Sequence, residues 1–126
     1  MLVTAFAQKT FKPIHYTMIF NGANKTAAQG EIKINLKDST ITVADSPVKK
    51  FKIIAISPDE NAIDENKVLQ MWVDFLCDGS DGTSCTIRVV RAKEPNGVNI
   101  LNVQLTYSSG DPVIYDCDYM QEIYAD

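Results

Sequence analysis

The feature of this sequence that most constrains its fold is a succession of short segments in which apolar and polar residues alternate. Residues 31–37, which read Glu-Ile-Lys-Ile-Asn-Leu-Lys, are the cleanest example, and residues 13–20 and 100–107 repeat the pattern. A period of two places successive side chains on opposite faces, as in a β-strand with one buried face. The alternation therefore predicts a chain of half-buried strands.

Short turn segments separate these strands. Residues 78–82 (Asp-Gly-Ser-Asp-Gly) and 94–97 (Glu-Pro-Asn-Gly) are rich in residues that tight turns require. Further strands are expected at residues 40–43, 51–56, 67–77, 85–91 and 113–120. Connections this short join neighbouring strands in antiparallel pairs. We therefore expect an all-β antiparallel meander of about eight strands that forms a small barrel or a sandwich.

Two segments carry additional signals. Ser57, Pro58 and Glu60 form a capping box, which predicts a short helical turn near residues 58–65. A longer helix to residue 76 competes with this interpretation, but the alternation from Leu69 onward and the following turn favour a strand. Residues 51–56 are apolar on both faces around Ile53 and Ile54, which predicts a central strand that is covered on both sides.

Size and charge limit the classes of function. The 126 residues fit one domain, which we place at residues 9–126. The net charge is −4, and the densest basic spots, Lys49-Lys50 and Arg88 with Arg91, are expected to be solvated strand faces, so we expect no nucleic-acid partner. The sequence holds no apolar run of the length that a membrane span needs, and no cofactor motif.

The N-terminus suggests a compartment. Residues 1–8 resemble the last part of a secretory signal, because an apolar stretch ends in Ala5-Phe6-Ala7, a small-x-small pattern that signal peptidases accept. This interpretation predicts a periplasmic or secreted protein. The alternative is that the likeness is accidental, that residues 2–7 form an edge strand and that the protein is cytoplasmic.

The three cysteines fit either compartment. Cys77 and Cys85 flank the turn at residues 78–82, so a hairpin there would bring them onto neighbouring strands. In an oxidising compartment they could form a disulfide, with Cys117 left over. The alternative is three buried free thiols.

Catalytic and metal-binding chemistry have weak candidates. His15 is the sole histidine, and no spacing pairs it with a nucleophile. The turn at residues 78–82 resembles a calcium loop only faintly, since the later ligands of such a loop are missing. Asp116 and Asp118 share one strand face but are expected to point to water. We therefore expect no metal site and no enzyme.

The strand aromatics are the best candidates for ligand or partner contacts. Trp72 shares a face with Gln70 and Asp74, opposite Met71 and Val73, which predicts either an interaction residue or the lid of a small second core. Three strand tyrosines join it as candidates, namely Tyr16, Tyr107 and Tyr115.

The meander of about eight short strands resembles lipocalin-like, or calycin-type, small barrels. In general style the chain is also similar to small exported bacterial proteins. The resemblance covers most of residues 13–120, although the Gly-x-Trp signature of lipocalins is absent and Trp72 lies in mid-chain. It implies a non-enzymatic binding module that holds a small apolar ligand in the barrel. A protein partner on a sheet face and homodimeric association through an edge strand are the alternatives.

Overall fold

The computed structural model describes residues 10–45, 47–57, 60–93, 99–108, 110–117 and 123–125, with the backbone alone at residues 99, 100, 124 and 125. All regular structure in these ranges is β-strand, and none of it forms a helix that is long and apolar enough to cross a membrane. The strands, in chain order, are β1 (Thr10–Phe11), β2 (Ile14–Asn21), β3 (Asn24–Asn35), β4 (Thr40–Val43), β5 (Lys49–Ile56), β6 (Glu60–Ile63), β7 (Leu69–Gly79), β8 (Ser84–Lys93), β9 (Asn99–Tyr107), β10 (Val113–Asp116) and β11 (Tyr124–Ala125).

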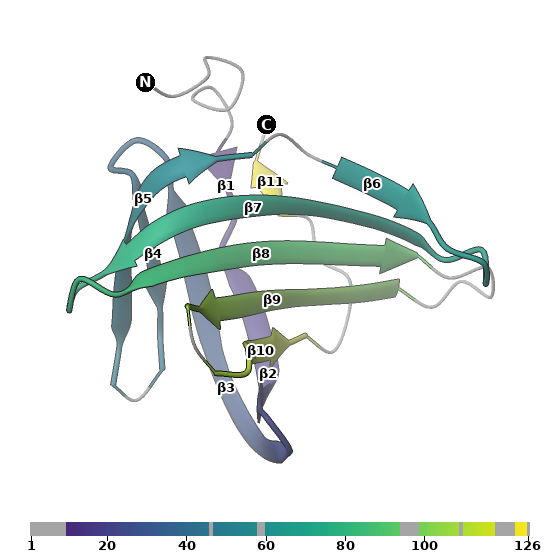
Figure 1. Cartoon of the computed structure of the whole chain (residues 1–126), viewed down its shortest axis with the longest axis horizontal. Helices are drawn as coiled ribbons and strands as arrows, with labels where there is room; N and C mark the ends of the chain where they lie inside the picture. The colour runs from purple at the N-terminus through teal and green to yellow at the C-terminus, as the bar shows by residue number, and fades with distance from the viewer. Residues whose placement is uncertain are drawn as a thin grey trace.

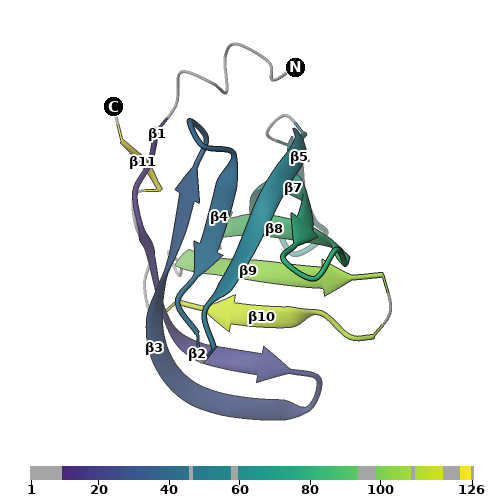
Figure 2. The same ribbon diagram turned by 90° about the vertical axis from the view of Figure 1, so that its left-hand side faces the viewer.

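The larger sheet closes into an antiparallel barrel. Its strand order is β5-β4-β3-β2-β10-β9-β8-β7-β6, and an additional pairing joins β5 to β7. Eight of these nine strands therefore form a closed ring, and β6 lies outside it. The all-β antiparallel prediction is confirmed, and the choice between barrel and sandwich resolves to a barrel (Figures 1 and 2).

A strong bend in β2 and β3 helps the sheet to close. β3 pairs with β2 along most of its length and then with β4, and it curls around the lower part of the barrel in Figure 2. The register between β2 and β3 shifts between Tyr16 and Met18, as at a β-bulge, which increases local bending. Gly30 lies opposite Tyr16 here, and a Cβ at residue 30 would collide with the Tyr16 hydroxyl and the Ala44 carbonyl.

The interior of the barrel is filled by large side chains. Alternate positions of the strands in the closed ring point inward along most of their length, and the fully buried members include Tyr16, Tyr115 and Phe75. β1 and β11 pair with each other, and Phe11 and Ile123 beside them join the same core, where the Phe11 ring packs edge-on against Phe75 with centroids 5.8 Å apart. The core is thus continuous from the barrel wall to the β1–β11 pair.

Three strands extend beyond the closed ring. β5 pairs with residues 75–79 of β7, and β10 pairs with residues 102–105 of β9, so the other ends of β7, β8 and β9 project past the barrel. β6 pairs with the projecting part of β7 and lies at its rim (Figure 1). We call this four-stranded part, formed by β6 and the projecting ends of β7, β8 and β9, the extension.

The predicted helical turn near residues 58–65 is wrong in its described part. Residues 60–63 form β6, and the chain then turns back into β7. Ser57, which suggested capping, has another partner, because its hydroxyl accepts a hydrogen bond from the Asp74 N–H. In the turn that follows β6, the Asp64 carboxylate accepts bonds from the N–H groups of Asn66 and Val68. Tertiary strand pairing therefore overrides the local helix signal. Pro58 and Asp59 lie outside the described residues.

The prediction that residues 51–56 are covered on both sides is also wrong. Phe51 and Ile53 are buried, but Ile54 is 55% exposed. The register between β5 and β7 shifts between Ile53 and Ala55, as at a β-bulge, and Ile54 lies on the outside of the barrel wall. β5 thus has one buried face, and its apolar run reflects the bulge.

Replacement of Gly30 by alanine is predicted to destabilise the fold. A Cβ at residue 30 would force the buried Tyr16 side chain and the Ala44 backbone apart, so we expect Gly30→Ala to lower the free energy of unfolding by about 1 to 3 kcal/mol. Urea denaturation of the purified variant measures this. Gly79→Ala is the control, because its nearest neighbour is the exposed Asp81 side chain at 3.1 Å; an equal loss in both variants would contradict the packing explanation.

Candidate functional site

The best candidate site lies on the outer face of the barrel wall, where β7 and β8 run side by side. In β7, Val73, Phe75 and Cys77 are buried in the core, so the residues between them point outward. The register places Trp72 opposite Val90 and Asp74 opposite Arg88. Directly opposed side chains lie on the same face of a sheet, so these four residues meet on the outside. We call Ser57, Trp72, Asp74, Arg88 and Val90 the Trp72 cluster.

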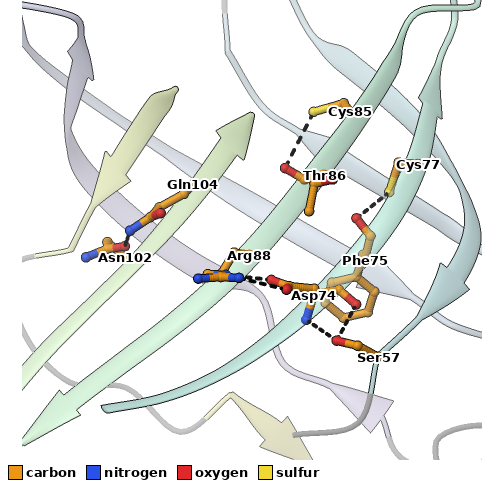
Figure 3. Close-up of polar contacts among 9 residues, drawn as sticks. All are labelled: Ser57, Asp74, Phe75, Cys77, Cys85, Thr86, Arg88, Asn102 and Gln104. Carbon is orange, nitrogen blue, oxygen red and sulfur yellow. Dashed lines mark hydrogen bonds and ion pairs between the residues drawn. The ribbon is translucent and has the colours of Figure 1, made fainter. Parts of the chain in front are cut away.

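A bidentate ion pair fixes the geometry of the Trp72 cluster. Arg88 Nε donates to Asp74 Oδ1 at 2.7 Å, and Arg88 Nη2 donates to Asp74 Oδ2 at 2.9 Å (Figure 3). Two parallel bonds hold the planar guanidinium in one orientation. The hydrogen bond with Asp74 raises the pKa of Arg88 above its usual value, so the cation is permanent.

Ser57 is hydrogen-bonded to the backbone of Asp74, the acidic member of this ion pair. The Ser57 hydroxyl accepts from the Asp74 N–H at 3.1 Å and donates to the Asp74 carbonyl at 3.4 Å. The Ser57 N–H also donates to the Asp74 carbonyl, at 2.9 Å. Ser57 thereby links the end of β5 to the middle of β7 at the position of the acidic side chain.

The Trp72 side chain is half-buried and lies beside the Arg88–Asp74 ion pair. The Arg88 guanidinium lies over the Trp72 ring, 5.4 Å from its centroid, which is within the range of a cation–π contact. Val90, directly opposite Trp72, is only 9% exposed although it is not part of the barrel core. The indole and Val90 therefore form a small apolar spot outside the barrel, and the prediction that Trp72 shares the face of Asp74, opposite Val73, is confirmed.

The same face continues in both directions. Gln104 lies opposite Arg88 on β9, and its amide donates to Asn102 at 3.2 Å (Figure 3). Toward the β7–β8 turn, an open groove of about 400 Å³ is lined by residues that include the exposed Leu76 and Ile54. The outer face thus combines a polar row with apolar residues at its ends.

Two of the predicted aromatic site residues lie inside the barrel. Tyr16 and Tyr115 are 2% and 0% exposed, and their rings pack edge-on with centroids 4.9 Å apart. The Tyr115 hydroxyl donates to Asp45 at 2.9 Å and accepts from Lys49 Nζ at 3.1 Å, while the Tyr16 hydroxyl donates to the Ala44 carbonyl. Burial, followed by the bond to Asp45, raises the pKa of Tyr115.

These contacts join the β4–β5 connection to the barrel interior, and each named hydroxyl has a partner. Tyr107 is half-buried against the same core. The structure therefore does not bring Tyr16, Tyr107 and Tyr115 to the face that carries Trp72. Lys49 and Arg88, expected as solvated basic residues, are instead engaged with Asp45 and Asp74.

The cysteines are free thiols in the described structure, and all three are buried. Cys77 and Cys85 lie directly opposite each other in the β7–β8 register. Opposed residues have Cα atoms about 4.5 to 5.5 Å apart, which is within the range that disulfides span. The disulfide therefore stays a prediction for an oxidising compartment.

The other candidate catalytic and metal-binding residues do not come together as a site within the described residues. His15 is on the surface with a side-chain exposure of 54%, and its Nδ1 lies 3.7 Å from Glu31. The Asp81 carboxylate accepts from the Thr83 N–H at 2.9 Å, which lowers the pKa of Asp81 and orders the turn. Within the described ranges, no three His, Cys, Asp or Glu residues are grouped as metal ligands. Asp118 and residues 1–8 lie outside those ranges.

The partners of Trp72 were missed from the sequence, because they depend on the exact centre of the β7–β8 turn. The turn predicted at residues 78–82 places Asp74 opposite Thr86, whereas a turn centred on Asp81, as observed, places Asp74 opposite Arg88. Their opposite charges then predict a cross-strand pair. Ser57 could not be found in this way, because it reaches Asp74 through the irregular end of β5.

The chain matches no protein-family model, no curated protein and no solved structure. Its fold and its candidate site are therefore known from its own residues and contacts.

Arg88 is predicted to shield Trp72 from water. Because Trp72 is the sole tryptophan, its fluorescence reports directly on the cluster. We expect Arg88→Ala to shift the emission to longer wavelength and to increase quenching by acrylamide, since the guanidinium over the ring is lost. Lys33→Ala on the exposed side of β3 is the control; equal spectra for wild type and Arg88→Ala would contradict the observed contact.

The buried thiols are predicted to destabilise the fold in alkaline solution. Burial raises the pKa of Cys77 to about 12 and that of Cys85 to about 11. A cysteine in the unfolded chain has a pKa of about 8.5, so above this pH the unfolded chain releases protons that the native chain keeps. This contribution to stability is complete below about pH 8.5 and is lost as pH rises toward the native values.

Urea denaturation in the presence of a reductant, repeated from pH 7 to pH 10, measures this effect. We expect the free energy of unfolding to fall above about pH 8.5 and the fall to be shallower in Cys77→Ala. A stability that is constant over this interval, or a slope that the substitution leaves unchanged, would show that the thiols are not the cause.

Proposed function

We propose that this protein is a non-enzymatic binding module that holds a protein partner on the outer face of β7, β8 and β9, with Trp72 and Arg88 as anchors. The observation that carries the proposal is the bidentate bond between Arg88 and Asp74, which fixes a guanidinium over an indole ring on the protein surface. Tryptophan and arginine are the residue types most enriched at the energetic centres of protein interfaces.

Preorganisation supports this use of the cluster. A flexible arginine loses conformational freedom when it binds, whereas Arg88 is held by two bonds to Asp74 and retains a side-chain exposure of 44%. Its partner Asp74 is only 19% exposed and is linked by its backbone to Ser57. The anchors therefore lie on a regular strand pair, where their positions are better defined than on a loop.

The surroundings of the cluster also suit a protein surface. Asn102 and Gln104 offer side-chain amides beside Arg88, and Ile114 and Phe20 continue the row that contains Gln104. Interfaces combine apolar and aromatic centres with polar groups at their rim. The face offers both kinds of group across neighbouring strands.

The filled interior favours the outer face over a ligand inside the barrel. Eight-stranded barrels are just wide enough to be filled by side chains or to hold one small ligand. Here Tyr16, Tyr115, Phe51 and Phe75 occupy the interior together with the aliphatic core. We infer that the barrel is of the calycin type, as its closed meander of eight strands suggests, but that it uses a different surface from a lumen-binding lipocalin.

A non-enzymatic role is part of this proposal. The groups that would serve as nucleophile and base lie apart: Cys77 and Cys85 point into the core with raised pKa values, and His15 lies on the surface beside Glu31. We also propose that the protein is exported to the periplasm or secreted, an inference supported by the Ala5-Phe6-Ala7 pattern.

Site-specific photo-crosslinking in the producing cell tests the proposed face. A photo-reactive amino acid in place of Gln70, which is exposed on the face of Trp72, is expected to capture one discrete protein. Trp72→Ala in the same chain should remove that product, and the affinity for the identified partner, once purified, should fall by on the order of tenfold to a hundredfold. Arg88→Ala should act in the same direction.

The matched control carries the photo-reactive residue at Lys33, on the exposed side of β3. The same product from Lys33, or a product from Gln70 that survives Trp72→Ala, would contradict the proposed site. A chain that gives no product at Gln70 while remaining folded would contradict the proposed function.

A further inference from the structure

The extension ends in a strand with an open edge. β6 pairs with β7 on one side and is the last strand in the sheet order, so no described strand lies beyond it (Figure 1). All four of its residues are exposed, and Ile63 is 67% exposed. Such an edge presents backbone N–H and C=O groups that another strand could pair with.

The hydrogen-bond pattern shows which groups of β6 face outward. The Asp64 N–H donates to the Val68 carbonyl at 3.1 Å, so in this register the bonded pairs with β7 are every second residue, including Ala62 with Gln70. The other side of β7 agrees, because Gly79 bonds to Thr83 and the odd-numbered residues of β7 therefore face β8. The backbone groups of Asn61 and Ile63 consequently point away from β7, toward the open edge.

We propose that β6 pairs with β6 of a second copy of this chain, antiparallel about a two-fold axis, with Asn61 opposite Ile63 of the partner subunit. In an antiparallel pair, residues on the same face must lie opposite each other, and Asn61 and Ile63 share one face. This register makes both of them hydrogen-bonded positions. Each Asn61–Ile63 pair exchanges two backbone bonds, and the symmetry provides the pair twice.

A second copy is the occupant that we propose, because most soluble oligomers are homo-oligomers with two-fold symmetry and the outward groups of β6 are compatible with a two-fold axis at Ala62. Registers that centre on Asn61 or on Ile63 would use each bonding residue once or would rely on residues outside β6, whereas the proposed register satisfies the outward groups of both residues on both chains. It also places the exposed Ile63 side chain against Asn61 of the partner subunit. Residues 60–63 contain neither proline nor lysine, two residue types that protect sheet edges, although the strand is short and Glu60 is charged.

The proposed register has one unfavourable feature, which makes it testable. Glu60 lies opposite Asp64 of the partner subunit, and two acidic groups in this relation weaken the pairing. The Asp64 carboxylate accepts bonds from Asn66 and Val68, which partly offsets its charge. We therefore expect a weak dimer that forms only at high protein concentration, and a positive charge at position 60 should strengthen it.

The two-fold axis stands perpendicular to the sheet, so the outer faces of both copies stay on the same side. Trp72 remains uncovered by the pairing, because it lies on the face of β7 and the contact runs along the edge of β6. The inference is therefore independent of the proposed function: Ile63→Lys, which lies on the face of β6 opposite to that of Glu60 and Trp72, should leave the crosslink at Gln70 in place, and Trp72→Ala should leave the dimer in place.

Sedimentation velocity over a concentration series tests the pairing with the full chain. The wild type is expected to shift from monomer to dimer as concentration rises. Ile63→Lys should weaken the dimer by at least about tenfold, because symmetry repeats each change twice, and Glu60→Lys should strengthen it several-fold. Leu76→Lys is the matched control, since Leu76 is a 52% exposed residue on β7 away from this edge.

Amide hydrogen exchange provides a second measurement that does not depend on a variant. Exchange at Asn61 and Ile63 should slow as the wild type dimerises, whereas Ala62, which already bonds to β7, should change little. A wild type that stays monomeric at all concentrations overturns the proposal. So does a dimer that Ile63→Lys leaves intact, and a weaker dimer for Glu60→Lys overturns the register.

Discussion

The pairing of β5 with β7 closes the barrel, and most of the structure depends on it. Without this contact the strands from β2 to β10 would form an open meander with two exposed edges. With it, Phe51 and Ile53 of β5 lie beside Phe75 and Cys77 of β7 on the inner surface of the wall, and each strand of the ring has one inner and one outer face. The register shift at Ile53–Ala55 lets the two strands meet while Ile54 faces outward. Closure therefore decides which residues are buried and which remain for contacts.

The filled interior follows from this closure. A small ring of strands leaves room for side chains, and the aromatic pair Tyr16–Tyr115 occupies part of that room. Its hydroxyls need partners because they are removed from water, and the β4–β5 connection supplies Asp45 and the Ala44 carbonyl. A polar network inside the barrel thus has a structural explanation, which supports the proposal that the binding face is on the outer surface.

Much of this fold could be predicted from the sequence because one-faced strands carry their burial pattern as alternation. The predicted bounds of β4, residues 40–43, match those of the structure. The face on which Trp72 lies followed from the alternation along β7. Sequence reasoning failed where a tertiary contact overrides a local pattern. The apolar run at Ile53–Ile54 reflects a bulge, and the capping pattern at Ser57 is replaced by a bond to Asp74.

The candidate site was less predictable than the fold for a related reason. Aromatic residue type alone did not separate buried from exposed candidates, since Tyr16 and Tyr115 lie on apolar strand faces whereas Trp72 lies on a polar one. The Arg88–Asp74 pair depends on the exact centre of the β7–β8 turn, and its support by Ser57 depends on how β5 ends.

β7 explains why the closure of the barrel and the open edge of β6 lie next to each other. Its odd-numbered residues bond to β8, and the opposite side of the strand pairs with β5 in its second half and with β6 in its first half. Because β5 and β6 are consecutive, the chain leaves the barrel wall at Ser57 and resumes pairing with β7 farther along it. The ring is closed where β5 lies, but no strand among the described residues lies beyond β6. The Trp72 cluster lies at the transition between these two halves of β7, on a strand that is held from both sides, while the adjoining edge is left available for another strand.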